Sequence, residues 1–311
     1  MVYAVIATPN PVLRQLPNGS WDSVYICGDE HYHYLTTLTG ERIPNTEVGV
    51  ASHTHATMQR APQAEMLDSD VPSQGVVRVP VILLNFTDLS FTMDNPQGNF
   101  SDFYNGAGGT NANSTGSVRD YFMYASDSLL DLQFDVYGPY TVSKTMAYYG
   151  ENTSSNHNKN VDELIAEAAK LADADGVDFA LYDNNNDGKV DNLSVIVAGY
   201  NEAEGGPANS IWPHYSGVYN SDSYSGKRIS KYLVISEYCG SGGKQQAGIG
   251  TYCHEFGHAL GLPDLYDTQN SSRYTVGTWD IMCAGSYNNN GCTPPSYSAF
   301  ERFAMGWLMP T

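Results

Sequence analysis

Residues 253–267 read CHEFGHALGLPDLYD, the most informative stretch of this 311-residue chain. Two histidines four residues apart project from one face of a helix about one turn apart, so His254 and His258 are expected side by side. Neutral imidazoles at this spacing can bind one Zn²⁺. Glu255 is then positioned to take a proton from a zinc-activated water and pass it to a leaving amine. The stretch therefore predicts an active-site helix with a catalytic zinc site.

The residues after the second histidine predict how this helix ends. Gly261 can adopt the left-handed turn that closes many helices, and Pro263 prevents the helix from resuming. The bend directs Asp264 back toward the metal as third ligand, in the pattern HExxHxxGxxD. Glu301 is the alternative third ligand, because thermolysin-like enzymes use a glutamate from a later helix. The break at Gly261 favours Asp264, and Glu301 is then a helix-surface or ion-pairing residue.

A methionine and a tyrosine downstream extend the pattern. Met282 lies in GTWDIMCAG (residues 277–285), where the order of motifs resembles the elongated metzincin motif and its Met-turn, with Asp264 replacing the third histidine. Alone, Met282 would be an ordinary core methionine. Tyr287, five residues later, is a candidate hydrogen-bond donor to the oxyanion. A chance HExxH on a core helix is the alternative, and the ordered presence of Gly261, Asp264 and Met282 disfavours it.

Over most of its length the chain resembles the immune inhibitor A family of secreted bacterial zinc metallopeptidases. Besides the zinc motif, the segments that carry the resemblance are LPNGSWDSVYICGDEHYHYLTTLTGERI (16–43), VPVILLNFTD (79–88), GSVRDYFMYAS (116–126), FDVYGPY (134–140), AGYNEAEGG (198–206), SIWPH (210–214) and WDIMCAG (279–285). The resemblance implies a metzincin-like catalytic domain, an N-terminal prosegment removed on activation, and protein substrates. It also implies a C-terminal region beyond Thr311, since family members usually continue past this domain.

Composition divides the chain into three expected parts. Residues 1–60 contain short alternating segments that indicate a β-rich propeptide, and residues 61–75 are polar and indicate a linker. Residues 76–311 are the expected catalytic domain. Its predicted strands and helices are, in order, the strand 76–86, a helix capped by Ser117, the strand 130–142, the helix 161–173, the strands 192–200 and 231–239, and the helix 249–260.

The predicted fold class is therefore α/β (α+β). We expect a metzincin-like zinc peptidase domain with a mixed sheet and an active-site helix, preceded by a small β-rich prosegment.

An Asp/Asn-rich loop, DNNNDGKVD at residues 183–191, predicts a structural calcium site. Its candidate ligands are four side chains and one carbonyl, belonging to Asp183, Asn185, Asp187, Asp191 and, through its carbonyl, Lys189. The loop is not an EF-hand, because Ser194 replaces the bidentate glutamate at position twelve. The alternative is a hairpin turn without metal. The resemblance to the family also suggests calcium here.

The overall charge and hydropathy restrict the partners. A formal net charge of −19 argues against nucleic acid, which requires a basic face. No run approaches the roughly 20 apolar residues of a membrane span. Met1–Ala7 is too short for a signal peptide, so a secreted or cell-surface bacterial protein would have lost its signal. The five cysteines define no disulfide framework. His31 and His33 are expected to be surface histidines.

These features predict a secreted zinc-dependent endopeptidase in proenzyme form, acting on proteins or peptides and inhibited by its own propeptide. Latency requires something to block the zinc: the Cys27 thiolate, the Asp29 carboxylate, or steric filling of the cleft by the prosegment backbone. The alternative function is a calcium-stabilised surface binding or adhesion module that retains zinc without turnover. The presence of Glu255 disfavours that alternative, because a non-catalytic site needs no general base.

Overall fold

The computed structural model describes residues 3–29, 32–49, 69–106, 114–153, 157–218, 222–268 and 275–309. Its strands are β1 (Tyr3–Ala4), β2 (Val12–Gln15), β3 (Trp21–Gly28), β4 (Tyr32–Thr36), β5 (Val48–Gly49), β6 (Gly75–Asn85), β7 (Leu130–Thr141), β8 (Lys189–Val190), β9 (Leu193–Tyr200), β10 (His214–Gly217), β11 (Ser223–Tyr224), β12 (Lys227–Ile229) and β13 (Lys231–Tyr238). Its helices are α1 (Pro96–Asn105), α2 (Val118–Ala125), α3 (Met146–Tyr149), α4 (Val161–Ala174), α5 (Ile249–Ala259) and α6 (Ala299–Ala304), with 3-10 turns η1 (Phe179–Tyr182), η2 (Gly277–Trp279) and η3 (Ala284–Tyr287).

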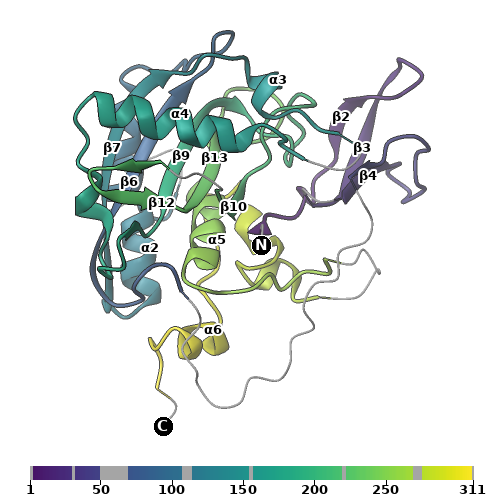
Figure 1. Ribbon diagram of the computed structural model, residues 1–311. Helices are drawn as coiled ribbons and strands as arrows, with labels where there is room; N and C mark the ends of the chain where they lie inside the picture. The colour runs from purple at the N-terminus through teal and green to yellow at the C-terminus, as the bar shows by residue number, and fades with distance from the viewer. Residues whose placement is uncertain are drawn as a thin grey trace.

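A six-stranded mixed sheet forms the centre of the molecule, in the order β1-β10-β13-β9-β6-β7. The four strands β13, β9, β6 and β7 run parallel, whereas β10 and β1 are antiparallel to their neighbours. A three-stranded sheet (β11-β12-β8) and a four-stranded sheet (β2-β3-β4-β5) complete the strands (Figure 1). The prediction of a mixed α/β architecture is confirmed.

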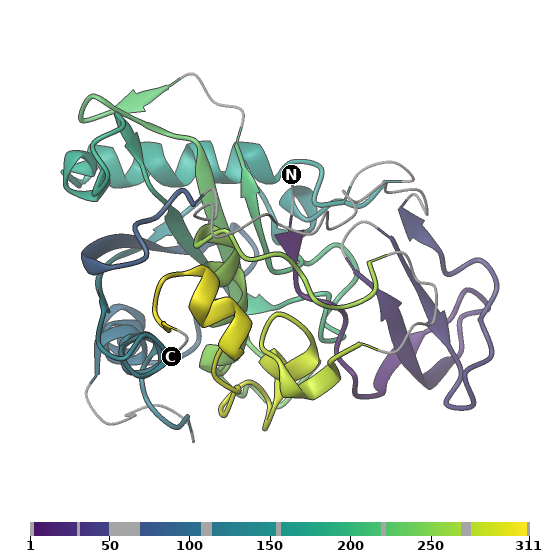
Figure 2. The same cartoon turned by 90° about the horizontal axis from the view of Figure 1, so that it is seen from below.

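Both faces of the central sheet are buried, which explains the continuous apolar run of β6. Val81 and Leu83 point into one hydrophobic core, and Ile82 and Leu84 into another. The first core contains residues of α1, α2 and α5, and the second contains residues of α3 and α4. Figure 2 shows the resulting layers, with α4 on one side of the sheet and α5 on the other.

The helices predicted over residues 161–173 and 249–260 are present and end within one residue of the predicted positions, and Ser117 caps α2 as predicted. Ser117 accepts a hydrogen bond from the backbone of Asp120, and the Asp120 side chain accepts one from the Ser117 backbone. Helix α4 buries its expected apolar stripe, including Leu164 and Ile165. Helix α5 is buried along its whole length, so its position is fixed by packing on every side. A helix packed on every side holds its side chains in constant geometry.

The N-terminal region, residues 3–29 and 32–49, is β-rich as expected, but its first strand joins the central sheet. Strand β1 pairs antiparallel with β10, with Tyr3 opposite Tyr215 and Ala4 opposite His214. A third hydrophobic core then joins this region to the rest of the chain, and its larger members are Val5, Val12, Val24, Ile26, Trp212 and Tyr287. The described part of this region is therefore attached to the rest of the chain both through β1, at the edge of the central sheet, and through this third core.

The expected linker, residues 61–75, is described from residue 69 onward, and that part differs from an exposed linker. Val71 is 2% exposed and belongs to the core beside α5. The Tyr215 hydroxyl donates to Oδ2 of Asp70 at 2.6 Å, and Nζ of Lys231 lies 3.1 Å from the same oxygen. These contacts hold residues 69–74 against the sheet, and β6 begins at Gly75.

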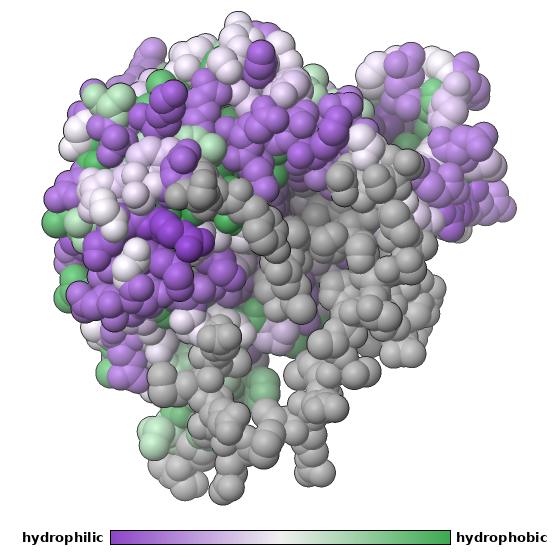
Figure 3. All heavy atoms as spheres, viewed as in Figure 1, coloured by the Kyte–Doolittle hydropathy of each residue, from purple (hydrophilic) through white to green (hydrophobic). Residues whose placement is uncertain are grey.

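No helix in the described part of the chain is both long and apolar enough to cross a membrane. The face in Figure 3 is mostly hydrophilic over its described residues, with scattered apolar side chains. This surface accords with the acidic composition of the sequence.

Candidate metal centre and the segment that covers it

Three side chains converge beside helix α5. Nε2 of His254 lies 3.2 Å from Nε2 of His258. Oδ1 of Asp264 lies 3.2 Å from each of these nitrogens. The three atoms form a nearly equilateral triangle, and all three side chains are buried, with Asp264 7% exposed. The structure thus brings together the three residues that the sequence nominated as ligands.

Backbone carbonyls fix the orientation of both imidazoles. Nδ1 of His254 lies 2.7 Å from the carbonyl oxygen of Ile281, and Nδ1 of His258 lies 2.7 Å from that of Leu262. A carbonyl can only accept, so each Nδ1 carries the proton and each Nε2 presents a lone pair to the triangle. This second layer of contacts is typical of metal-binding histidines.

The triangle fits a zinc ion. In a tetrahedral site with zinc–ligand distances of about 2.0–2.1 Å, neighbouring ligand atoms lie about 3.3–3.4 Å apart, close to the spacing found here. Two imidazole nitrogens and one carboxylate oxygen are also a donor set that zinc accepts. Burial raises the pKa of the Asp264 carboxyl, but His258 and His254 outweigh burial and lower it to about 2. The carboxyl is therefore ionised, as a metal ligand must be.

The turn that delivers Asp264 has the predicted geometry. Gly261 has a φ of 92°, in the left-handed region. Its amide donates to the carbonyl of His258 at 2.9 Å, and the amide of Leu262 donates to that of Gly257 at 2.9 Å. These bonds close the helix in a glycine-dependent turn, after which the chain reverses toward His254 and His258.

Met282 packs directly beneath the helix. A Cβ atom on Gly257 would lie 2.6 Å from Sδ of Met282, so a larger residue next to His258 would force one of the two to shift. The Met282 carbonyl accepts a hydrogen bond from Leu265 at 2.8 Å, and its amide donates to Oδ1 of Asp280 at 2.8 Å. The segment after α5 and the segment around Met282 are therefore tied together beside the triangle.

Glu301, the alternative third ligand, is engaged elsewhere. Its Oε2 accepts hydrogen bonds from the Ser298 amide at 2.6 Å and the Ser298 hydroxyl at 2.8 Å, which caps α6. Glu301 is 2% exposed rather than on the helix surface. Burial, followed by the charge of Asp280, raises the pKa of Glu301 to about 7. The structure therefore pairs Glu301 with Asp280, and brings Asp264 to the histidines.

Glu255 lies on α5 beside the triangle and faces the N-terminal region. Its Oε1 accepts a hydrogen bond of 2.9 Å from the Val5 amide, one residue beyond β1. Among the described residues, His254, Glu255 and His258 form a group whose ligand atoms lie within 4.8 Å of one another. Glu255 is thus close enough to act on a molecule at the metal centre, and a peptide amide already occupies that position.

Two further residues hold the backbone of this covering segment. The indole nitrogen of Trp212 donates to the Val5 carbonyl at 2.8 Å. The Tyr287 hydroxyl donates to the Ile6 carbonyl at 2.6 Å. The amide at Glu255 belongs to the peptide bond between Ala4 and Val5. The carbonyl that Tyr287 binds, that of Ile6, therefore lies two residues beyond the carbonyl of that peptide bond. The role of Trp212 could not be predicted from the sequence, because a buried indole gives no local sign of its hydrogen-bond partner.

The start of α5 is pressed against the segment that carries Tyr287. A Cβ atom on Gly250 would lie 2.0 Å from the Ser286 carbonyl oxygen, and one on Gly248 would lie 2.2 Å from the Gly291 carbonyl carbon. The amide of Gly250 donates to the Gly291 carbonyl at 2.8 Å. The small residues before the zinc motif therefore permit backbone-to-backbone packing, which positions Tyr287 beside the site.

The two residues proposed to block zinc have contacts within the N-terminal sheet. Sγ of Cys27 lies 3.7 Å from the Thr36 hydroxyl, across the pairing of β3 with β4. Oδ1 of Asp29 accepts from the Tyr32 amide at 3.2 Å. The structure thus places the Val5 backbone, rather than either side chain, against Glu255. The five cysteines are all free thiols.

A second anchor of the N-terminal region lies around Glu202, in the loop after β9. His33 is 4% exposed, not a surface histidine, because its ring stacks on Trp212 at 4.9 Å. Its Nε2 lies 3.6 Å from Oε1 of Glu202. The Arg14 guanidinium donates to the backbone carbonyls of Gly206 and Glu202. These buried polar contacts tie β2 and β4 to the loop after β9.

The candidate calcium loop is stabilised by its own hydrogen bonds. The Asp183 carboxylate accepts from the amides of Asp187 and Gly188, and the Asp187 amide also donates to Asn185. Two ammonium groups reach the loop as well, since Lys227 pairs with Asp183 and Lys189 with Asp187.

One oxygen of the loop lacks a donor. Oδ1 of Asp191 is buried without a hydrogen-bond partner among the described residues. Burial raises the pKa of Asp191 to about 6.

The part of the chain that contains these residues matches known proteins. Residues 81–308 match the family model described as immune inhibitor A peptidase M6, catalytic domain. The chain is 32% identical over 230 residues to pre-pro-metalloprotease PrtV of Vibrio cholerae serotype O1, strain M66-2, covering 65% of this chain and 25% of that protein. It is 27% identical over 191 residues to immune inhibitor A of Bacillus thuringiensis subsp. alesti, covering 51% of this chain and 27% of that protein.

The match of this mixed α/β domain to a peptidase family model, and to a relative named as a metalloprotease, places it in the class of metallopeptidase domains. Within that class, the chain belongs to the immune inhibitor A peptidase M6 family. The aligned part of the chain spans about a quarter of the length of these curated relatives.

Proposed function

We propose that this protein is a secreted zinc-dependent endopeptidase whose N-terminal region keeps it latent. The observation that carries the proposal is the triangle of ligand atoms, 3.2 Å on each side, formed by His254, His258 and Asp264 next to Glu255. This arrangement supports a metzincin-like site with Asp264 as third ligand. The pre-pro name of the Vibrio relative supports export and processing.

The proposed roles of the zinc ion and of Glu255 follow from their chemistry. When bound, zinc supplies Lewis acidity, which polarises the scissile carbonyl and lowers the pKa of a water to roughly 7. Glu255 accepts the proton of the attacking water and transfers it to the leaving nitrogen. The distance of 2.9 Å between Oε1 of Glu255 and the Val5 amide nitrogen supports this role, because a peptide nitrogen can reach the carboxylate at hydrogen-bonding distance.

Tyr287 and β10 would hold the substrate backbone. The Tyr287 hydroxyl already donates to a peptide carbonyl, that of Ile6, and β10 already pairs with an added strand, β1. Addition of a peptide strand to a sheet edge is a common mode of peptide recognition. The carbonyl that Tyr287 binds is not the carbonyl of the peptide bond whose amide lies at Glu255. We therefore assign Tyr287 to positioning of the substrate backbone.

Latency by steric filling of the cleft follows from the same contacts. The Val5 amide is hydrogen-bonded to Glu255, the proposed general base. Strand β1 pairs with β10 and so covers the sheet edge to which a substrate would bind. Removal of the N-terminal region would free both at once. The prosegment would thus act as an intramolecular inhibitor through its backbone, without a ligand from Cys27 or Asp29.

We also propose that the loop at residues 183–191 binds Ca²⁺ as a structural ion. The buried, unpartnered Oδ1 of Asp191 supports this, because a cation would satisfy it. The nearby ammonium groups of Lys227 and Lys189 would compete with the ion. Millimolar calcium should therefore raise the melting temperature of the wild type and leave Asp187→Asn unchanged, whereas an equal shift in both would remove the proposal.

The test of the main proposal is cleavage of unfolded casein by the wild type and by Glu255→Ala, each before and after limited proteolysis of the N-terminal region. We expect activity in the processed wild type alone, lost on chelation and restored by zinc. Zinc content is measured in parallel and should be equal in both proteins. Stoichiometric zinc with no cleavage by the processed wild type would favour the binding-module alternative.

A further inference from the structure

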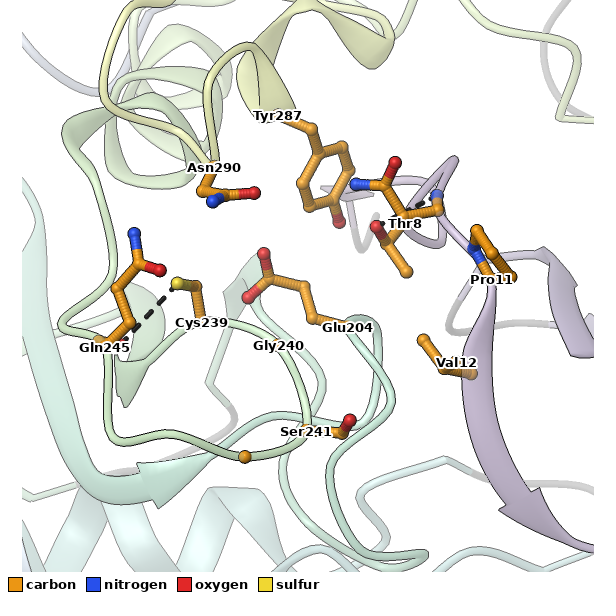
Figure 4. Close-up of a pocket in the computed structure, with 12 residues that line it drawn as sticks. Thr8, Pro11, Val12, Glu204, Cys239, Gly240, Ser241, Gln245, Tyr287 and Asn290 are labelled. Carbon is orange, nitrogen blue, oxygen red and sulfur yellow. Dashed lines mark hydrogen bonds between the residues drawn. The ribbon is translucent and has the colours of Figure 1, made fainter. Parts of the chain in front are cut away.

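A cavity of about 220 Å³ lies between the N-terminal region and the loops around Glu204, Cys239 and Tyr287 (Figure 4). It is too small for a drug-sized ligand, since such pockets measure about 300–1,000 Å³, and is better suited to a single side chain. Thr8 and Val12 form its wall on the N-terminal side. Removal of the N-terminal region would therefore open the cavity toward the groove that this region now fills.

The cavity adjoins the path of the backbone that covers the metal centre. The Val5 amide lies at Glu255, the Ile6 carbonyl at Tyr287, and the Thr8 amide donates to the Ala203 carbonyl at 2.9 Å. Both Tyr287 and Thr8 also line the cavity. A peptide following the same course would therefore pass the cavity within a few residues on the C-terminal side of the bond at Glu255.

Glu204 sets the charge of the cavity. Its side chain extends toward the cavity from the loop after β9, and the residue is 8% exposed (Figure 4). Oε2 accepts from Nδ2 of Asn201 at 2.8 Å, and the Glu204 amide donates to Oδ1 of Asn201 at 2.9 Å, so the carboxyl is held in place. Burial raises the pKa of Glu204 to about 7. A carboxyl this deeply buried is costly without a countercharge.

The other lining groups supply no countercharge. None of the described residues that line the cavity is a lysine, arginine or histidine. Gln245 and Asn290 contribute neutral amides, and burial raises the pKa of the Cys239 thiol to about 12, so that it stays uncharged. A positively charged ligand would therefore balance the charge of the Glu204 carboxylate, and the amides of Gln245 and Asn290 could form further hydrogen bonds with it.

We propose that this cavity is a substrate subsite in which Glu204 selects a lysine or arginine side chain on the C-terminal side of the cleaved bond. The inference rests on the proposed peptidase function. Glu204 is then a specificity-determining residue that takes no part in the chemical step. A bound peptide would replace the N-terminal residues as the cover of Glu204, so the salt bridge would form largely out of contact with water, where a charge-assisted hydrogen bond is strong.

The test uses the full chain activated by limited proteolysis and peptides that differ at one scanned position among Arg, Leu and Glu. We expect one position beyond the cleaved bond to favour Arg over Leu by at least tenfold in kcat/KM. Glu204→Gln should reduce cleavage of the Arg peptide by about 10–100-fold and change that of the Leu peptide less than about threefold. Glu204→Arg should favour the Glu peptide. Glu202→Gln, a buried glutamate two residues away that does not line the cavity, is the matched control and should keep the selectivity of the wild type.

Each outcome bears on the inference separately from the proposed function. Wild-type cleavage with no preference for a basic residue at any position would overturn the inference and leave the peptidase function intact. Unchanged selectivity in Glu204→Gln would do the same. If no peptide is cleaved, the peptidase function fails, and binding of the Arg and Leu peptides to processed Glu255→Ala, measured by fluorescence anisotropy, decides the inference without turnover. Equal binding of the two peptides would overturn it.

Discussion

Gly257 and Met282 are in direct contact beneath the metal centre, and a Cβ atom on Gly257 would approach Sδ of Met282 to 2.6 Å. Met282 is fully buried, so it cannot turn away into solvent. Gly257→Ala should therefore displace the helix that carries His258, at a cost of about 1–3 kcal/mol in the free energy of unfolding. Because such supporting contacts orient metal ligands, we expect zinc affinity to fall by about 10–100-fold. Chelator competition and thermal denaturation measure the two effects.

Two companion variants make this prediction specific. Gly217→Ala is the matched control, because its new Cβ would meet the Ser230 carbonyl oxygen at an ordinary 3.5 Å. The double variant Gly257→Ala with Met282→Ala removes the clashing atom and should regain part of the lost zinc affinity. If the double variant binds zinc no better than Gly257→Ala alone, the contact does not support the site in the way inferred here.

The choice between Asp264 and Glu301 as third ligand can be tested by zinc affinity. Oδ1 of Asp264 lies 3.2 Å from both imidazole nitrogens, whereas Glu301 caps α6 through Ser298. Asp264→Ala should lower zinc affinity by more than about 100-fold, because a lost ligand costs more than a lost outer contact. Glu301→Gln should stay within about threefold of the wild type. The reverse ranking, measured by competition with a zinc chelator, would assign the third ligand to Glu301.

The convergence of His254, His258 and Asp264 could be predicted from the sequence, because it depends on residues close together in the chain. Helical spacing brings His254 and His258 together, and Gly261 ends the helix in a turn that any chain with this pattern can form. Asp264 follows within a few residues, so its approach depends on that turn alone. The candidate calcium loop rests on the same kind of local pattern, but Lys227, which pairs with Asp183, comes from a distant strand, β12, and could not be predicted.

The contacts that cover the centre could not be predicted, because they join residues far apart in the sequence. Strand β1 has two residues, too few for any periodicity, and pairs with β10 more than 200 residues later. The burial of His33 and Glu204 likewise depends on how the N-terminal region docks. Val5 is an ordinary apolar residue whose relevant group is its backbone amide, and a backbone group leaves no trace in the amino-acid sequence.

The pair formed by Glu301 and Asp280 should make stability depend on pH. Burial and the neighbouring charge raise the pKa of Glu301 from 4.5 to about 7, so the folded state binds more protons than the unfolded state between those values. The destabilisation is therefore absent at low pH and complete above about pH 7. Glu301→Gln, which stays neutral and can still accept from Ser298, should gain about 1–3 kcal/mol at pH 8 relative to its effect at pH 5. Denaturant unfolding at both pH values measures the difference, and Glu41→Gln, at an exposed position, should show none.

Arg14 should contribute to latency, because its guanidinium donates to the carbonyls of Gly206 and Glu202 and so ties β2 to the loop after β9. Loss of these partly buried bonds in Arg14→Ala should weaken docking of the N-terminal region by about 1–2 kcal/mol and raise the activity of the unprocessed protein about tenfold. After proteolytic removal of the region, wild type and variant should cleave casein at equal rates. Arg42→Ala is the control, since Nε of Arg42 lies 3.1 Å from Oε1 of Glu47, within the N-terminal region itself. Equal activity of unprocessed Arg14→Ala and Arg42→Ala would show that this anchor does not hold the covering strand over Glu255.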